Sequence, residues 1–258
     1  MSDYPEWESC AVNPDLYIEN YTDYTKDPVL KNILDGKRVA IVGPSSHLIG
    51  ENLGDYIDSF DVVVRVGFLE EPSEKTTKDY GGRTDIIIHS FNCFEIPVAK
   101  DNIDYLCGTK FVICGMVSND FIDEHELFFD LLRGRSCNIQ NVDDSFLYGF
   151  FRSVGTICNL GLIGIELMLK YQIESLYVTG MSFYNMGKYG RVYGDSYFEM
   201  VSDKMGIYKK TIDREVTPES ARSDLHVQGP QIDYFRNLVK KDNRIILDEY
   251  LDKNLFIS

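Results

Sequence analysis

Short apolar runs recur along the chain, and each has the pattern of a strand that is buried on both faces. The residues in each run are almost continuously apolar, often β-branched, and do not alternate with polar residues. Such strands are typical of parallel sheets, in which helices cover both faces. The predicted strands are residues 38–43 (RVAIVG), 61–66 (DVVVRV), 85–90 (DIIIHS), 110–115 (KFVICG), 175–180 (SLYVTG) and 244–247 (RIIL).

Helical patterns alternate with these strands. The clearest one starts at Gly229-Pro230, a good beginning for a helix, and then repeats apolar residues at helical spacing. The alternation predicts an α/β, Rossmann-like, doubly wound and mostly parallel sheet, with ligands at the carboxyl ends of the strands. A stretch rich in glycine and tyrosine, residues 184–210, is expected to be a long active-site loop. The predicted helices are residues 50–58, 96–106, 120–133, 154–170 and 230–241.

Length and charge narrow the class of protein. The chain has 258 residues, which suits one domain over residues 37–258 after an acidic N-terminal segment, residues 1–36. A formal net charge of -15 disfavours a nucleic-acid partner or an anionic membrane surface, because phosphates would be repelled. Residues 1–26 lack the pattern of a signal peptide, and no apolar stretch is long enough to span a bilayer. We therefore expect a cytoplasmic protein, including in a viral or bacterial setting.

Cysteine and histidine positions give no sign of a metal site. The six cysteines contain no CxxC pair and no spacing typical of zinc. Three lie inside apolar runs and are expected to be free, buried thiols, which favours a reducing compartment. His47, His89 and His125 are too far apart in the sequence to be nominated as ligands. No metal is predicted.

The turn after the first strand is a candidate anion site. Gly43 is followed by Pro44, Ser45 and Ser46, so that backbone N–H groups and two hydroxyls could face an anion before the next helix. An ordinary tight turn would have the same residues. Neither GxGxxG nor GxxxxGK[ST] occurs, which disfavours dinucleotide and P-loop sites.

A longer segment around this turn, residues 39–67, reads VAIVGPSSHLIGENLGDYIDSFDVVVRVG, and residues 80–84 read YGGRT. The first segment resembles the large sialylmotif of the animal-type sialyltransferase family, and the second is similar to the end of the same motif. The strand, the G-x-S turn and the later glycine, aspartates and arginine occur in the family's order and spacing. The matching later residues are Gly54, Ile57, Asp58, Asp61 and Arg65.

Three further segments resemble the family's other motifs, in the same order along the chain. Ser153-x-Gly155 together with residues 175–183 (SLYVTGMSF) is similar to the small motif. Residues 196–199 (SYFE) resemble the third motif, and His226 with Gln231 resembles the very small motif, normally His-x-x-x-x-Glu. The ordered set covers about residues 38 to 235 and is more specific than any one of its members.

The resemblance implies a metal-independent, inverting glycosyltransferase with a single-domain GT-A-variant catalytic fold over residues 37–258. Its donor would be a CMP-linked nonulosonic acid, sialic acid or a relative such as Kdo, and its acceptor a glycan hydroxyl, with no cofactor. His226 would be the general base, because a neutral imidazole can take the acceptor's proton. The implied donor contacts are Gly43, Ser45 and Ser46 to the nucleotide, Ser153 and Gly155 to the sugar carboxylate at the start of the 154–170 helix, and Ser196 and Tyr197 near the leaving phosphate.

Several departures from the family pattern leave alternatives open. Pro44 and Gly67 stand where the family has asparagines, Ser196 replaces a histidine and Gln231 replaces a glutamate. The paired cysteines that join the family's large and small motifs are also absent. A non-catalytic CMP-sugar-binding protein and a structural scaffold therefore remain alternatives, and an oxidoreductase is disfavoured by the missing glycine fingerprint. The acceptor and the linkage are not encoded in any of these motifs.

Overall fold

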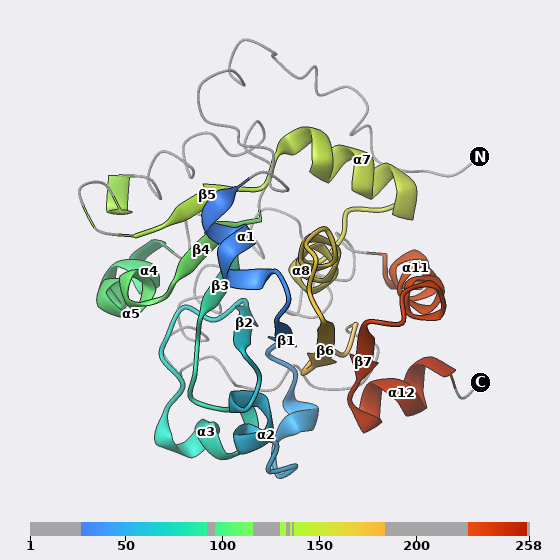
Figure 1. The fold of residues 1–258 in the computed structure, drawn as a ribbon, viewed down its shortest axis with the longest axis horizontal. Coiled ribbons are helices and arrows are strands. Elements are labelled where there is room, and N and C mark those ends of the chain that lie inside the picture. The colour runs from blue at the N-terminus through green and yellow to red at the C-terminus, as the bar shows by residue number, and fades with distance from the viewer. Residues whose placement is uncertain are drawn as a thin grey trace, which may run out of the picture.

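A seven-stranded parallel sheet forms the centre of the protein in the computed structural model (Figure 1). The strand order is β5-β4-β3-β2-β1-β6-β7. The structure describes residues 27–91, 96–115, 130–132, 135, 137–183 and 227–256, without the side chains of Ser46 and Pro97. The strands are β1 (Arg38–Val42), β2 (Val62–Val66), β3 (Ile86–His89), β4 (Phe111–Cys114), β5 (Ile139–Asn141), β6 (Ser175–Thr179) and β7 (Ile245–Leu247).

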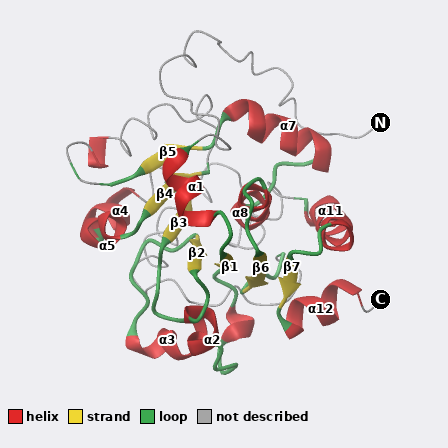
Figure 2. Cartoon of the chain, viewed as in Figure 1, coloured by secondary structure: helices red, strands yellow, loops and turns green. Residues whose placement is uncertain are grey.

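Helices lie on both faces of this sheet (Figure 2). They are α1 (Pro28–Leu34), α2 (Gly54–Asp58), α3 (Glu74–Tyr80), α4 (Ile96–Asp101), α5 (Ile103–Gly108), α7 (Asp144–Val154), α8 (Leu160–Leu169), α11 (Gln228–Lys241) and α12 (Glu249–Phe256), with a 3-10 turn at Ser46–Leu48. All six predicted strands are present, and the prediction of a doubly wound parallel sheet is confirmed.

Successive residues of each central strand pack into different cores, which explains the continuous apolar runs. In β1, Val39 and Ile41 join the core under α1, α7, α8 and α11. Ala40 and Val42, one residue on, join a second core under α2 and α3. A third core lies between β3, β4 and the α4–α5 pair. Because side chains alternate across a sheet, a strand covered on both faces needs apolar residues at every position.

The strand order reverses direction between β1 and β6. From β1 the chain proceeds through β2, β3, β4 and β5 toward one edge, and it then crosses back to place β6 and β7 on the other side of β1. In open α/β sheets such a reversal leaves a crevice at the carboxyl ends of the two strands, and ligands bind there. The strand order therefore indicates a ligand-binding site at the carboxyl ends of β1 and β6.

The predicted helix over residues 154–170 is wrong in its boundaries. Helix α7 ends at Val154, Gly155 follows in the left-handed conformation (φ 85°), and Asn159 caps a new helix, α8. The sequence contains both signals, a glycine just past a helical stretch and an asparagine before the next one. Helix α1 belongs to the predicted N-terminal segment, yet Leu30 and Leu34 are fully buried in the main core. Strand β5 and helices α1, α3, α7 and α12 were not predicted.

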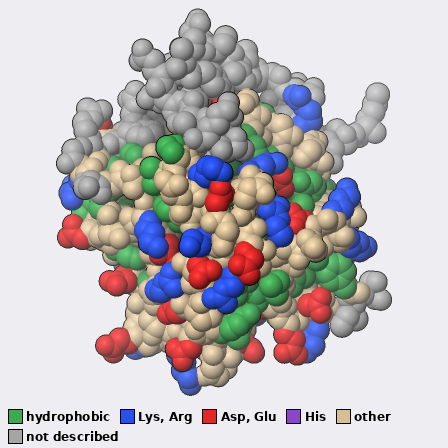
Figure 3. Space-filling model, viewed as in Figure 1, with side chains coloured by type: hydrophobic (Ala, Val, Ile, Leu, Met, Phe, Trp, Pro, Cys, Tyr) green, Lys and Arg blue, Asp and Glu red, His purple; other side chains and the backbone are tan. Residues whose placement is uncertain are grey.

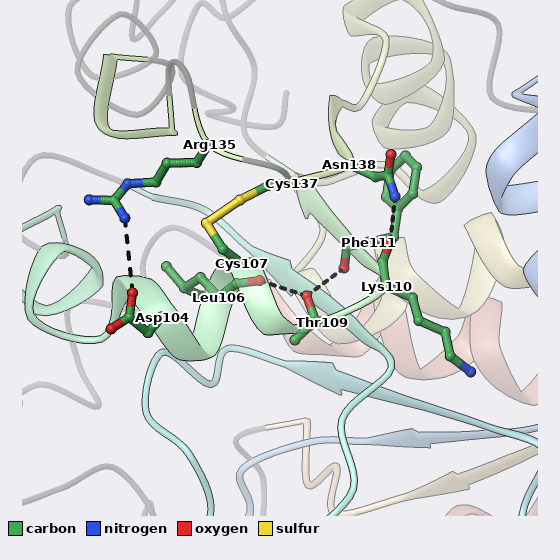
Figure 4. Close-up of a disulfide and its surroundings, with 9 residues drawn as sticks. All are labelled: Asp104, Leu106, Cys107, Thr109, Lys110, Phe111, Arg135, Cys137 and Asn138. Carbon is green, nitrogen blue, oxygen red and sulfur yellow. Dashed lines mark hydrogen bonds and ion pairs between the residues drawn. A yellow bond between two sulfur atoms is a disulfide. The ribbon is translucent and has the colours of Figure 1, made fainter.

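The expectation of free, buried thiols holds for two of the four cysteines in the described residues. Cys114 and Cys158 are free and buried, but Cys107 and Cys137 form a disulfide between the end of α5 and the segment before β5 (Figure 4). Disulfides persist in oxidising compartments, so this bond removes the argument for a reducing one.

Two further features concern the surface charge of the protein and its relation to membranes. Acidic and basic side chains are interspersed on the face shown in Figure 3. Within the described residues, no helix has both the length and the apolar character that a membrane crossing requires.

Candidate functional site at the carboxyl ends of β1 and β6

The ends of β1 and β6 meet backbone to backbone at two glycines. A Cβ atom on Gly43 would lie 2.4 Å from the carbonyl oxygen of Gly180, and one on Gly180 would lie 2.3 Å from the carbonyl oxygen of Gly43. Gly180 also has a positive φ of 68°. Any larger residue would push the two strands apart, so glycine is required at both positions for this close approach.

Most of the backbone N–H groups that were predicted to bind an anion at this turn already have hydrogen-bond partners. The N–H of Gly43 donates to the carbonyl of Thr179 (2.9 Å), and the N–H of Ser45 donates to the carbonyl of Gly180 (2.8 Å). Pro44 has no N–H, so the backbone donors expected at residues 43–45 hold the junction together and do not face a ligand. The half-buried hydroxyl of Ser45 remains as the polar group that this part of the turn can present.

Helix α8 begins at the same edge of the sheet. Its cap residue Asn159 accepts a hydrogen bond from the N–H of Leu162 (2.9 Å) through its side chain. The N–H groups of Leu160 and Gly161 belong to the first turn and have no acceptor within the helix. A Cβ on Gly161 would lie 3.0 Å from the sulfur of Met181, the second residue after β6. Two backbone donors and the positive end of a ten-residue helix therefore lie next to the junction.

The start of α11 is tied to the loop before α8. Gln231, which is fully buried, accepts a hydrogen bond from the N–H of Asn159 (2.9 Å) and donates to the carbonyl of Val227 (3.2 Å). The N–H of Val227 in turn donates to the hydroxyl of Thr156 (3.3 Å). Val227 directly follows His226, so the very small motif is anchored one residue away from the predicted base. His226 itself lies outside the described residues, as do Ser196 and Tyr197.

Ser153 and Gly155 lie at the C-terminus of a helix, whereas the sequence predicted the N-terminus of one. They belong to the C-terminus of α7, where the Ser153 hydroxyl donates to the carbonyl of Phe150 (2.7 Å) and the Gly155 N–H donates to that of Phe151 (2.8 Å). A helix C-terminus is the negative end of the helix dipole and attracts cations. The expectation that this helix end favours a carboxylate is therefore wrong, although the following loop, through Thr156, does reach α11.

The large motif's arginine is a structural residue. Arg65 is completely buried in β2, and its guanidinium donates to the carbonyls of Tyr80 (3.0 Å), Gly81 (2.8 Å) and Arg83 (3.0 Å) and to the hydroxyl of Thr84 (2.9 Å). Its guanidinium also lies 5.4 Å from the centre of the Phe68 ring. Burial lowers the pKa of Arg65, but an arginine stays charged. This single side chain holds the whole YGGRT segment.

Other residues of that motif complete the same assembly, which we call the Arg65 latch (Arg65, Asp58, Arg83, Asp85 and residues 80–84). Asp58 accepts hydrogen bonds from the N–H groups of Gly82 (2.7 Å) and Arg83 (3.0 Å). The Arg83 side chain donates to Asp85 (2.7 Å) and to nearby carbonyls. The latch connects to the site through Tyr80, whose hydroxyl donates to the carbonyl of Ser45 (2.7 Å). Through this hydrogen bond the latch stabilises the turn at Ser45.

Two residues that the sequence did not nominate face Ser45 from the other side. His47 Nδ1 lies 3.0 Å from Ser45 Oγ, and His47 Nε2 lies 3.1 Å from Asp248 Oδ2. Asp248 also accepts from the hydroxyl of Thr179 (2.7 Å), and the ring of Tyr250 stacks on His47 at 3.9 Å between centroids. His47 and Asp248 are 201 positions apart, so only the fold could reveal this contact.

Hydrogen bonding keeps Asp248 ionised. Burial alone would raise the pKa of this carboxyl, but hydrogen bonds from His47, the N–H of Leu251 and Thr179 outweigh burial and leave the pKa below its usual value. The side chains of His47 and Asp248 are only 8% and 3% exposed, so this charge and its partner are largely shielded from water. Among the described residues, no group of three His, Cys, Asp or Glu side chains could hold a metal ion.

Comparison with known proteins gives fold-level likeness only. No protein-family model and no curated protein matches the chain. A mammalian sialyltransferase solved in complex with Gal-beta-1-3GalNAc-ortho-nitrophenol is 17% identical, with 71% of this chain and 70% of that chain covered and a TM-score of 0.45. The sialyltransferase CstII from Campylobacter jejuni, solved with the substrate analogue CMP-3FNeuAc, is 10% identical over 82% of this chain and 78% of that one, also at 0.45. A second CstII structure, with cytidine-5'-monophosphate, is 12% identical over 74% and 84%, again at 0.45. At these identities and TM-scores the likeness carries no conclusion about the function of this chain.

Proposed function

We propose that this chain is a glycosyltransferase that uses a CMP-linked nonulosonic acid as its donor. One observation carries the proposal, namely that the segments resembling separate sialylmotifs converge on one edge of the sheet. The large motif ends β1 at Gly43 and Ser45, the small motif ends β6 at Gly180, and Val227 of the very small motif lies beside the loop that leads into α8. These segments meet at the reversal of strand order, which is where α/β folds bind ligands.

The donor phosphate would bind between Ser45 and the start of α8. The free N–H groups of Leu160 and Gly161 and the helix dipole favour an anion, and the Ser45 hydroxyl adds a further polar contact. Hydrogen-bond donors fixed before the reaction can stabilise the charge that develops on a leaving phosphate, and they need no cation to do so. The mechanism proposed here is accordingly metal-independent, with CMP as the leaving group.

His226 would remove the proton of the acceptor hydroxyl as it attacks the anomeric carbon, with inversion. The next residue, Val227, precedes the fourteen-residue helix α11, whose positive N-terminal end disfavours imidazolium and keeps a neighbouring histidine neutral. A neutral imidazole can accept a proton near pH 7. Ser196 and Tyr197 are proposed to contact the leaving phosphate, in line with the resemblance. The alternative, a binding protein for CMP-sugars without transfer, uses the same pocket without this step.

The first experiment separates the two candidates. Thermal-shift measurements of the full chain with CMP, CMP-sialic acid, CMP-Kdo and UDP-sugars should show stabilisation by the cytidine ligands, because binding to the folded state raises apparent stability. Transfer and donor hydrolysis are then measured across a panel of glycan acceptors. Stabilisation by CMP without transfer or hydrolysis would favour the binding protein, and no stabilisation by any cytidine ligand would reject both candidates.

The second experiment tests the base. His226→Ala should lower turnover by roughly 100- to 10,000-fold, the usual contribution of a general base, while CMP affinity changes little. Turnover by this variant near that of the wild type would exclude His226 from the role. A parallel loss of CMP affinity would instead indicate a contact to the donor.

A further inference from the structure

Ser45, His47 and Asp248 form a continuous hydrogen-bonded line at the edge of the proposed phosphate site. The imidazole bridges the other two, with Nδ1 on Ser45 Oγ (3.0 Å) and Nε2 on Asp248 Oδ2 (3.1 Å). Asp248 is fixed in turn by the hydroxyl of Thr179 and by the N–H of Leu251. Neither the proposed base nor the proposed helix contacts use this line, and its residues come from two separate segments of the chain, the turn after β1 and the residue between β7 and α12.

The position of one hydrogen atom in this line depends on the charge of His47. An ionised Asp248 only accepts hydrogen bonds, so Nε2 of the imidazole must carry a hydrogen in both charge states. When the ring is neutral, Nδ1 has a lone pair and accepts the hydrogen of the Ser45 hydroxyl. When the ring is protonated, Nδ1 donates to Ser45 Oγ, and the hydroxyl hydrogen is released to point at a ligand.

The other ionisable groups around His47 do not compete for this proton. Tyr250 of α12 stacks on the ring, and its pKa is raised by burial. Tyr177 of β6, near Asp248, has a pKa raised to about 12, also mainly by burial. Tyr80 of α3 donates its hydroxyl to the Ser45 carbonyl, and burial raises its pKa as well.

Three exposed groups lie farther out, where Lys253 of α12 pairs with Glu249 of the same helix and also interacts with Glu51 after the turn. The ion pair raises the pKa of Lys253 and lowers the pKa of Glu249, so neither changes charge across the neutral range. Histidine is the side chain that ordinarily changes charge between pH 5 and 8. A proton taken up in that range by this cluster therefore goes to the imidazole.

We propose that Ser45, His47 and Asp248 form a proton-coupled binding site for a phosphodiester anion, in which ligand binding at the Ser45 hydroxyl is accompanied by protonation of His47. The inference rests on the proposed function, which places the donor phosphate at this turn. The backbone N–H groups of Gly43 and Ser45 are already bonded to β6, so the hydroxyl is the group that must donate here. The buried carboxylate of Asp248 compensates the new charge on the ring. Donor affinity thus increases as the pH falls through the neutral range.

The test measures binding of cytidine 5′-phosphate methyl ester by titration calorimetry at several values between about pH 5.5 and 8. The ester resembles the donor in being a phosphodiester, whereas CMP itself loses a proton near about pH 6 and would obscure the result. At each pH, two buffers with different ionisation enthalpies report the number of protons taken up. We expect net proton uptake at the upper end of the range and an affinity that falls roughly three- to tenfold from about pH 6 to 8.

Variants assign the proton to the ring. His47→Gln keeps an amide group between Ser45 and Asp248 but cannot titrate, so its affinity should be independent of pH and its proton uptake should vanish. Tyr250→Phe is the matched control, because it keeps the stacked ring and should retain the wild-type profile. Circular dichroism establishes that each variant is folded, and the two-buffer measurement on the wild type needs no variant.

The outcomes separate this inference from the proposed function. Binding of the cytidine ester with no proton uptake and a flat pH profile would overturn the proton-coupled site and leave the proposed function standing. No binding of the ester at any pH would overturn both. Equal binding of the uridine ester, with proton uptake that His47→Gln abolishes, would support the proton-coupled site and contradict the cytidine donor.

Discussion

Replacing Arg65 by methionine removes a guanidinium that is completely buried and bonded to four acceptors in residues 80–84. Three of the acceptors are backbone carbonyls, and the fourth, the Thr84 hydroxyl, keeps a partner in the hydroxyl of Tyr105 (3.0 Å). Hydrogen bonds to a charged group contribute about 1.5–3 kcal/mol each to stability. Removing the guanidinium also removes the free-energy cost of burying its charge, which offsets part of this loss. We therefore expect a net loss of about 3–5 kcal/mol in the free energy of unfolding.

The assay is thermal and chemical unfolding of Arg65→Met beside the wild type. For a chain of this size the loss corresponds to a fall in Tm of roughly 6–20 °C. Arg38→Met is the matched control, since Arg38 begins the neighbouring strand and its side chain is 44% exposed in its pair with Asp61. The control should stay within about 2 °C of the wild type. A Tm for Arg65→Met equal to that of the control would refute the structural role assigned to the latch.

Further predictions concern the junction, the disulfide and the buried carboxyl. Gly43→Ala should lower the free energy of unfolding by about 3 kcal/mol in urea denaturation, because its Cβ would meet a backbone oxygen, whereas Gly149→Ala, with nothing within 4 Å, should not destabilise. Replacing Cys107 and Cys137 together by serine should cost about 3–4 kcal/mol for a separation of 30 residues, and peptide mapping without reductant should recover the two cysteines linked. Because the pKa of Asp248 is lowered in the folded protein, its ionisation stabilises the fold above the unfolded pKa, and that contribution is lost as the pH falls. The stability difference between the wild type and Asp248→Asn should therefore shrink below about pH 4, and a constant difference would contradict this.

The sheet could be predicted from the sequence because its signal is local. Each central strand is recognisable from its own continuous apolar residues, such as Val62, Val63 and Val64, which are buried on alternate faces of the sheet. The Gly43 turn was likewise located correctly at the end of the first strand. Strand β5 (Ile139–Asn141) escaped prediction because two of its three residues, Gln140 and Asn141, are polar although buried, so it lacks the continuous apolar run of the other strands.

What the amino-acid sequence determined by itself was therefore the six apolar strands, the parallel sheet and the turn at Gly43 and Ser45 on its carboxyl edge. Only the tertiary structure decided what those residues do there. Ser45 has its N–H bonded to Gly180, and its hydroxyl faces His47 and, through it, Asp248. A hydrogen bond depends on which group lies opposite, and neighbours brought together from positions 201 residues apart leave no periodic trace in the chain. The burial pattern of a strand can be read from one segment, whereas a functional site depends on contacts between segments that are distant in the sequence.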